Sequence, residues 1–208
     1  ACGNNINFSF DVDSLIGWNG IDYEIIINDR YDTVSTNNPN IPFLHIFQYP
    51  GNWPIQIEIG NTYCTLDSTI MVKIFPKPKA EFSISDTTGC EPISVLFTDS
   101  SYIILPSAYT GDSTYITNWN WNFDNGLQLD TEFPPIIDYY AKDDSAGFYY
   151  PILEVITNVG CKDTFNFAVA IESYPTPVAI IDVYPTGNNS GQYYFDGTGS
   201  ETSSGFTP

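Results

Sequence analysis

The chain has 208 residues, of which 42% are apolar and 16% aromatic, so it can bury the core of one large domain or of two domains of about 100 residues. Its formal net charge is −19, and a field of that sign repels the phosphates of nucleic acids and anionic lipid surfaces. No apolar run approaches the roughly 20 residues of a membrane span, and no signal peptide is visible. We expect an ordered piece of a longer polypeptide.

Every predicted element is a β-strand. The segments are short, rich in β-branched and aromatic residues, and separated by turn residues. No window of about 12 residues carries a helical apolar stripe with caps. In chain order, we expect strands at 5–10, 22–28, 43–48, 53–59, 68–75, 79–85, 93–98, 116–123, 135–140, 148–157 and 163–172.

The chain repeats itself. The stretch FPKPKAEF begins at Phe75, and the similar stretch YPTPVAII begins 99 residues later at Tyr174. A period near 100 is too long for a solenoid and suits a chain of sandwich domains. We therefore predict an all-β protein of tandem immunoglobulin-like β-sandwiches joined by short, semi-rigid Pro-x-Pro linkers. The predicted domains are 1–75, 76–174 and a truncated third domain at 175–208.

Four cysteines are spread along the chain, and none belongs to a CxxC pair, so a zinc site is not expected. Separate cysteines in such a chain predict two disulfides and an oxidising compartment. Three pairings are possible. In each copy, one cysteine lies near the first core strand and the other just before the last strand. We therefore predict Cys2–Cys64 and Cys90–Cys161, each closing a loop within one domain and contributing roughly 4 kcal/mol.

The second copy resembles a PKD domain, an immunoglobulin-like β-sandwich family. The resemblance rests on the opening segment GCEPISVLF at 89–97, on WNFDNG at 121–126 and on a Gly-x-Tyr strand beginning at Gly147. The hexapeptide is similar to the WDFGDG hallmark, with Asn122, Asp124 and Asn125 where the family more often has Asp, Gly and Asp. The resemblance implies a core motif of Trp121, Phe123 and Gly126. The first copy is then a degenerate PKD-like domain without this motif, and the third looks like a PKD start.

Residue alternation gives the same expectation for the tryptophans. In a strand, Trp119, Trp121 and Phe123 point to one face. Three large aromatic side chains on a solvent face would make a costly exposed patch. We predict that Trp121 and Phe123 pack in the core, and we leave Trp119 open between core and surface.

Enzymatic activity is not expected, and no catalytic residue is assigned. The single histidine, His45, has no serine, cysteine or acidic partners that would form a triad. The acidic pairs at 11/13 and 143/144 are more simply solvated loops than a glycosidase pair. No cofactor is expected except calcium, for which oxygen-rich loops supply candidate ligands although no EF-hand loop is present. The candidates are Asp11, Asp13, Asp99, Asp124 and Asp144.

Asp followed by Ser or Thr occurs nine times, where random order would give about three. Six of these sites continue with a small or aliphatic residue or Thr, and they resemble the O-glycosylation sequon of Bacteroidota. Turn formation is the alternative, because Asp, Ser and Thr all stabilise turns. The candidate acceptors are Ser14, Thr33, Ser68, Thr87, Ser113 and Ser145.

Three functions fit these features. The first is a structural or adhesive segment of a long extracellular or cell-surface protein, similar to the repeat regions of large adhesins that gliding bacteria export by the type IX route. Its partners would be neighbouring domains of the same chain, surface polysaccharide or other cell-surface proteins, with no nucleic acid and no direct membrane span. The second is a carbohydrate-binding accessory module of a secreted polysaccharide-degrading enzyme, and the third is a subunit of a surface filament. The aromatic pool for sugar stacking is Trp18, Trp53, Trp119, Tyr139, Tyr140 and Tyr149.

Overall fold

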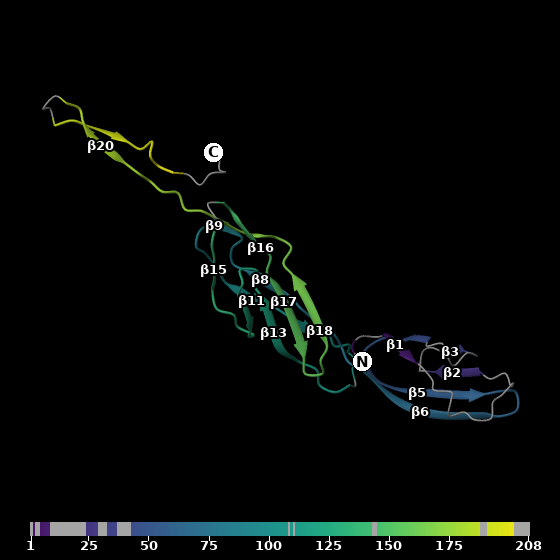
Figure 1. Ribbon diagram of the computed structural model, residues 1–208. Helices are drawn as coiled ribbons and strands as arrows, with labels where there is room; N and C mark the ends of the chain where they lie inside the picture. The colour runs from purple at the N-terminus through teal and green to yellow at the C-terminus, as the bar shows by residue number, and fades with distance from the viewer. Residues whose placement is uncertain are drawn as a thin grey trace. The chain divides into compact units, whose positions relative to one another are not determined.

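A computed structural model describes Cys2 and residues 5–8, 24–28, 33–36, 43–107, 109, 111–142, 145–187 and 191–201. Every regular element in these residues is a β-strand, so the predicted all-β class is confirmed (Figure 1). In the same residues there is no helix with the length and apolar character needed to cross a membrane. By contacts, the chain divides into one unit of Ala1–Lys79, Tyr102–Thr117 and Val155–Asp163 and a second of Ala80–Ser101, Asn118–Glu154 and Thr164–Pro208. The domain limits near 75 and 174 stay a prediction.

The first unit contains a four-stranded sheet beside a two-stranded one. The four-stranded sheet has the order β3-β2-β5-β6, and its long antiparallel hairpin of β5 and β6 is clear in Figure 1. The strands are β1 (Asn5–Phe8), β2 (Glu24–Asn28), β3 (Thr33–Thr36), β4 (Phe43–Ile46), β5 (Gly51–Gly60) and β6 (Thr65–Ile74), and β1 pairs with β4.

A compact apolar cluster forms the core of this sheet. Trp53 and Ile55 alternate along β5 and point to one face, as a strand period of two requires. Trp53 lies 5.6 Å from Phe47, centroid to centroid, and its indole nitrogen donates a hydrogen bond to the Tyr49 carbonyl at 3.0 Å. The buried members of the cluster are Ile27, Phe47, Trp53, Ile55 and Ile74.

The rest of the chain up to residue 174 adds several small sheets. A four-stranded sheet has the order β14-β13-β17-β18, and a three-stranded sheet has the order β16-β19-β9. Strand β10 pairs with β15, β8 with β11, and β7 with β12. The strands are β7 (Pro78–Lys79), β8 (Phe82–Ile84), β9 (Thr88–Cys90), β10 (Ile93–Val95), β11 (Phe97–Asp99), β12 (Tyr102–Ile103), β13 (Ile116–Asn122), β14 (Gln128–Asp130), β15 (Ile137–Tyr139), β16 (Gly147–Tyr149), β17 (Ile152–Thr157), β18 (Lys162–Asn166) and β19 (Ile171–Tyr174).

Four predicted strands, at 79–85, 93–98, 148–157 and 163–172, are each split in two, and two of the breaks have an identifiable cause. The segment 93–98 divides at Leu96, where the pairing partner changes from β15 to β8. The Leu96 N–H is donated to the Ser85 hydroxyl instead of a ladder carbonyl. The segment 148–157 divides at Pro151, which has no N–H to donate to a ladder. Apolar patterning locates such segments, but it cannot indicate a change of partner.

An aromatic cluster forms the core of the second unit. The Phe82 ring lies 5.0 Å from Trp121, 5.2 Å from Phe165 and 5.4 Å from Phe167, centroid to centroid. Trp121 is 1% exposed and stacks on the fully buried Phe123 with their planes 3° apart. Of the three residues of the predicted core motif, Trp121 and Phe123 lie in the core, whereas Gly126 is exposed in the turn that follows.

The residues after Phe123 form a turn, and its backbone conformation accounts for the residue types found at Asp124 and Gly126. Phe123 donates its N–H to the Leu127 carbonyl at 3.1 Å, which closes the turn. Gly126 has φ +91° and Asp124 has φ +60°, so both occupy the left-handed region. The family that this hexapeptide resembles more often has Gly at the position of Asp124, and an Asp tolerates this backbone conformation better than most residues. Its carboxylate also accepts the Tyr150 N–H at 3.0 Å, which a glycine could not do.

A third hairpin follows, made of β20 (Asp182–Pro185) and β21 (Tyr193–Asp196). Its entry reproduces the entry to the second copy. The Ser101 hydroxyl accepts the Glu81 N–H and donates to the Glu81 carbonyl, at 3.1 and 3.2 Å. The Ser200 hydroxyl makes the same two bonds to Ile180, at 3.0 and 3.1 Å. Both residues of the pair are displaced by 99 positions, so the repeat seen in the sequence is also a repeat of contacts.

Tyr139 and Tyr149 are both buried, but they differ in whether the hydroxyl forms a hydrogen bond, so replacing each with Phe tests what that bond contributes to stability. The Tyr139 ring is fully buried and its hydroxyl has no hydrogen-bond partner among the described residues, whereas the Tyr149 hydroxyl donates to the Tyr140 carbonyl at 2.6 Å. Burial, followed by the Asp124 carboxylate, raises the pKa of Tyr139, so its hydroxyl stays protonated at neutral pH. We expect Tyr139→Phe to leave the urea midpoint unchanged or raise it, and Tyr149→Phe to lower stability by about 1 kcal/mol. A larger loss for Tyr139→Phe than for Tyr149→Phe would contradict this packing.

Substitution of Gly126 tests whether the turn requires a residue with positive φ at this position. A Cβ at this position would meet no atom within 4 Å, so only the backbone conformation opposes a side chain. We expect Gly126→Ala to reduce stability by about 1–2 kcal/mol, measured by urea unfolding. Gly126→Asn is the control, because Asn adopts positive φ more readily, and it should recover part of the loss. Equal stability of the Ala variant and the parent chain would refute a left-handed residue here.

Candidate functional site

One disulfide joins distant parts of the first unit. Cys2 is bonded to Cys161, with a Cα–Cα distance of 5.5 Å and a sequence separation of 159 residues. Cys2 lies beside Phe75 in a parallel bridge, and Cys161 lies in the turn between β17 and β18. Cys161 is fully buried, and its N–H donates to the Thr157 hydroxyl at 3.0 Å.

This connection corrects the predicted pairing of Cys2 with Cys64. Cys64 lies in the turn of the β5–β6 hairpin, next to the pair Gly60 and Thr65, whereas Cys2 lies beside Phe75 at the opposite end. The hairpin has nine steps between these ends, or about 30 Å at the usual strand rise. A disulfide requires Cα atoms within about 7 Å, so Cys2 and Cys64 cannot bond.

The predicted Cys90–Cys161 bond is also wrong, because Cys161 is bonded to Cys2. Cys90 ends β9 and pairs in parallel with Tyr174. Cys64 and Cys90 are both exposed thiols. The prediction of cysteine-based cross-linking is therefore met by one disulfide, with two thiols left at the surface.

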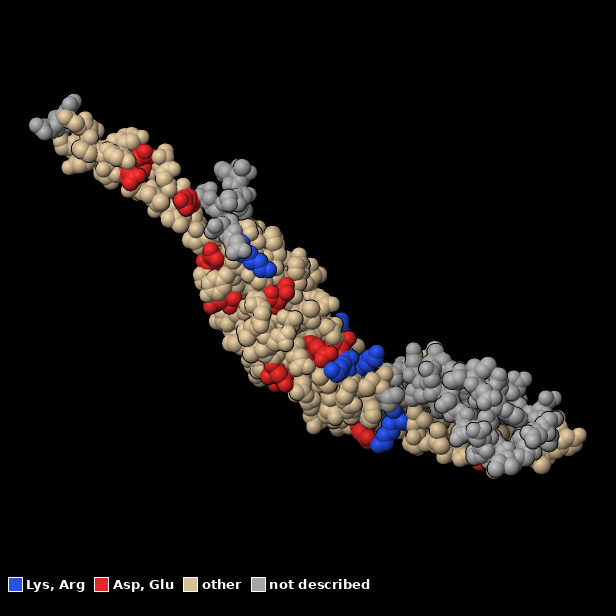
Figure 2. Space-filling view, viewed as in Figure 1, with Lys and Arg blue, Asp and Glu red and all other residues tan. Residues whose placement is uncertain are grey.

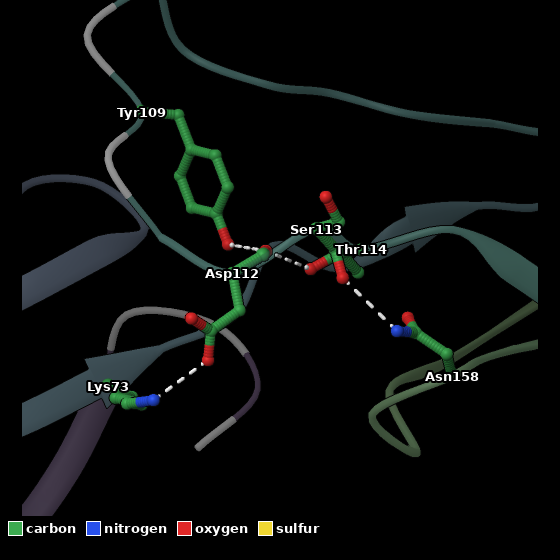
Figure 3. Close-up of polar contacts among 6 residues, drawn as sticks. All are labelled: Lys73, Tyr109, Asp112, Ser113, Thr114 and Asn158. Carbon is green, nitrogen blue, oxygen red and sulfur yellow. Dashed lines mark hydrogen bonds and ion pairs between the residues drawn. The ribbon is translucent and has the colours of Figure 1, made fainter.

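The turn that carries Cys161 also holds the loop before β13. Asn158 donates its side-chain amide to the Ser113 carbonyl at 3.1 Å (Figure 3). Its side-chain oxygen accepts the Tyr115 N–H at 3.1 Å. Its own N–H donates to the Tyr115 carbonyl at 3.0 Å. Sequence reasoning missed this residue. The signal was available, since an Asn precedes the turn cysteine by three positions in both copies, as Asn61 and Asn158.

An ion pair joins β6 to the same loop. The Lys73 ammonium lies 2.8 Å from a carboxylate oxygen of Asp112, and the Asp112 carbonyl accepts hydrogen bonds from the Tyr109 and Thr114 hydroxyls (Figure 3). Both charged side chains are about half exposed, so the pair contributes less than about 1 kcal/mol. Together with the disulfide, this ion pair forms a set of linkage contacts between residues of the first predicted domain and residues of the second.

The calcium candidates are not brought together in the described residues. Asp99 uses its carboxylate internally, since it accepts the Trp119 indole N–H at 2.8 Å and the Ser101 hydroxyl at 2.6 Å. Asp124 accepts the N–H of Tyr150, which follows β16. Asp11, Asp13 and Asp144 lie outside the described residues. Across the described ranges, no group of three or more His, Cys, Asp or Glu side chains could hold a metal ion.

The aromatic side chains proposed to stack on sugars do not form an exposed strip where they are described. Trp53 and Tyr149 are 4% and 6% exposed, and Tyr139 is fully buried. Trp119 is half-buried, and its indole N–H donates to Asp99. It is therefore neither a core residue nor a fully exposed one, the two possibilities that the sequence left open. Only Tyr140, at 55%, is largely exposed, and Trp18 lies outside the described residues.

The candidate sugar acceptors differ in their surroundings. Ser113 lies in the loop of the linkage contacts and Ser68 in β6, and both are exposed. Thr33 begins β3 and is also exposed. Ser145 is exposed with its hydroxyl donated to the Lys142 carbonyl, while Thr87 is half-buried. Ser14 lies outside the described residues, and attachment of a sugar at any of these hydroxyls stays a prediction.

On the face shown in Figure 2, the acidic side chains of the described residues are spread out rather than gathered at one position. Figure 2 shows them as separate groups on the visible face, with the few basic side chains between some of them. Among the described residues on that face, the acidic side chains do not form a single patch.

Comparison with known proteins gave similarities among solved structures. No family model matches the chain, and no curated protein matches it. Among solved structures, the PKD1 domain of the Vibrio cholerae metalloprotease PrtV is similar at a TM-score of 0.35 and 24% identity, and the match covers 47% of this chain and 98% of that domain.

Asp99 and Asp112 distinguish an internal carboxylate from a surface one. Removing the Asp99 carboxylate leaves the partly buried Trp119 indole N–H and the Ser101 backbone N–H without their acceptor. We expect Asp99→Ala to cost about 2 kcal/mol of unfolding free energy and to shift tryptophan emission. Asp112→Ala, the control, should cost less than about 1 kcal/mol because its ion pair is solvated. Equal losses for the two variants would argue against a structural role for Asp99.

Proposed function

We propose that this chain is a load-carrying spacer segment of an extracellular, multidomain cell-surface protein. The observation that carries the proposal is the Cys2–Cys161 disulfide, which joins the start of the first copy to a turn of the second across 159 residues. Tension applied along the chain passes through this bond, so the residues between the two cysteines are shielded from extension. A spacer between a cell and a distant contact needs this property.

Other features support an extracellular site. A disulfide persists in oxidising compartments and is rare in reducing ones. The net charge of −19 favours solubility at a cell surface. The exposed Asp-Ser/Thr sites, such as Ser68 and Ser113, would carry glycans that protect loops and strands from proteases. Adhesion would then be a property of the parent protein, exported by the type IX route as the sequence resemblance implies.

The carbohydrate-binding alternative has less support. The described aromatic side chains that would stack on a sugar are mostly buried, with Tyr140 as the exposed exception. Measurable binding of the isolated chain to surface polysaccharides, abolished by Tyr140→Ala, would favour that alternative over a spacer.

Single-molecule stretching from the two ends of the chain tests the spacer proposal. The fully extended oxidised chain should be about 55 nm shorter than the reduced chain, since 159 residues at roughly 3.3–3.6 Å each stay outside the force path. Cys2→Ser should show the longer extension without reductant. Cys64→Ser is the matched control and should behave like the parent chain, because Cys64 is a free thiol. Equal extension of the oxidised and reduced chains would overturn the proposal.

A further inference from the structure

The two copies each contain a cysteine at the same position near their start. Cys2 pairs in parallel with Phe75, and Cys90 pairs in parallel with Tyr174. Phe75 and Tyr174 are the aromatic residues that begin the two Pro-x-Pro segments. We call Cys2 and Cys90 the start cysteines, because each lies against the end of its own copy.

Each copy also contains a turn cysteine. Cys64 follows Asn61 by three positions in the β5–β6 turn, and Cys161 follows Asn158 by three in the β17–β18 turn. The Cys64 carbonyl accepts the Asn61 N–H at 2.9 Å, and the Cys161 carbonyl accepts the Thr157 N–H at 2.9 Å. The second turn closes one residue earlier relative to its Asn, so the two turns are equivalent but not identical.

The observed disulfide therefore has a direction along the repeat. It joins the start cysteine of the first copy to the turn cysteine of the second, and not two cysteines of one copy. If the same bond recurs between the second copy and the third, Cys90 bonds to the turn cysteine of the third copy. If it recurs between a preceding copy and the first, Cys64 bonds to the start cysteine of that preceding copy.

Contacts at the entry to the third copy reproduce those at the entry to the second. Lys79 pairs with Tyr102, and Val178 pairs with Glu201, so both partners are displaced by 99 positions. The third hairpin nevertheless exposes the residues whose equivalents are buried. Ile181 and Phe195 are each 66% exposed.

In the second copy, the equivalent of Ile181 is Phe82, 99 positions earlier, and the equivalent of Phe195 is Phe97, which pairs with Ile84 as Phe195 pairs with Val183. Phe82 and Phe97 are 4% and 3% exposed under the remaining strands of their sandwich. The exposed apolar side chains of the third hairpin therefore match a sandwich domain whose further strands would cover them. Such a domain would also contain its own turn equivalent to the turns of Cys64 and Cys161.

We propose that Cys64 and Cys90 are the two open ends of a disulfide series that staples each domain of the parent protein to the next. Cys90 bonds to the turn cysteine of the domain that begins at residue 175, and Cys64 bonds to the start cysteine of a domain before this chain. This inference rests on the proposed function in one respect, that the chain is part of an array. Both thiols are exposed, as such a bond requires.

Each bond forms by thiol–disulfide exchange with an oxidised dithiol oxidoreductase of the export compartment. The cysteine thiolate attacks the enzyme disulfide, and the second protein thiolate displaces the enzyme from the mixed disulfide. Two protein thiols lose two protons and two electrons, and the enzyme disulfide is reduced to a dithiol. Atoms and electrons therefore balance without another oxidant.

Disulfide mapping of the parent polypeptide tests this inference. The protein is taken from cells in the presence of N-ethylmaleimide, digested without reduction and analysed by mass spectrometry. We expect the Cys90 peptide to be cross-linked to a cysteine peptide from beyond residue 208, and the Cys64 peptide to one from before residue 1. The isolated 208-residue chain should instead carry two maleimide groups, on Cys64 and Cys90.

Cys90→Ser in the parent polypeptide is the matched variant. It should make one cysteine of the following domain reactive to maleimide while leaving the Cys2–Cys161 peptide unchanged. Maleimide on Cys90 in the parent, or a Cys64–Cys90 cross-link within or between copies, would overturn the inference. Those outcomes leave the Cys2–Cys161 bond and its shielding of 159 residues intact, so they are distinct from failure of the proposed function.

Discussion

The Cys2–Cys161 bond is the constraint on which this account of the molecule depends. It fixes the start of the chain, beside Phe75, to a turn that is itself held by Thr157 and Asn158. Noncovalent contacts around it are modest, since the Lys73–Asp112 ion pair is half exposed and the β7–β12 ladder has only two residue pairs. A covalent bond therefore supplies the strength that these contacts lack.

The two apolar cores have a different role from the disulfide. In the first unit the cluster around Trp53 buries one face of the first half of β5 and Ile74 at the end of β6. In the second unit, the cluster around Phe82 and Trp121 packs the strands against one another. Each cluster stabilises its own unit by burial of apolar area, which is independent of force direction. The disulfide instead carries tension that is applied along the chain. In a spacer, packing therefore stabilises each folded unit and the cross-link resists extension.

Residue patterning predicted much of this fold. Alternation placed Trp121 and Phe123 on a buried face, and Gly126 has the positive φ that its turn position required. The pattern failed where one residue type fits two environments. Trp53 and Tyr139 were assigned to a sugar-binding pool, but an aromatic side chain serves a core as well as a surface, and only the strand pairing decides which face it occupies. The cysteine pairing failed for a related reason, because a repeat specifies equivalent positions and does not specify whether a bond runs within a copy or to the next one.

The most direct measurement is a non-reducing peptide map of the 208-residue chain, alkylated in its folded state. The account predicts one cross-linked pair of peptides, containing Cys2 and Cys161, with Cys64 and Cys90 alkylated. Cross-links of Cys2 with Cys64 and of Cys90 with Cys161 would mean that each copy is closed on itself. The force path through the chain, and the series of bonds inferred from it, would then both be contradicted.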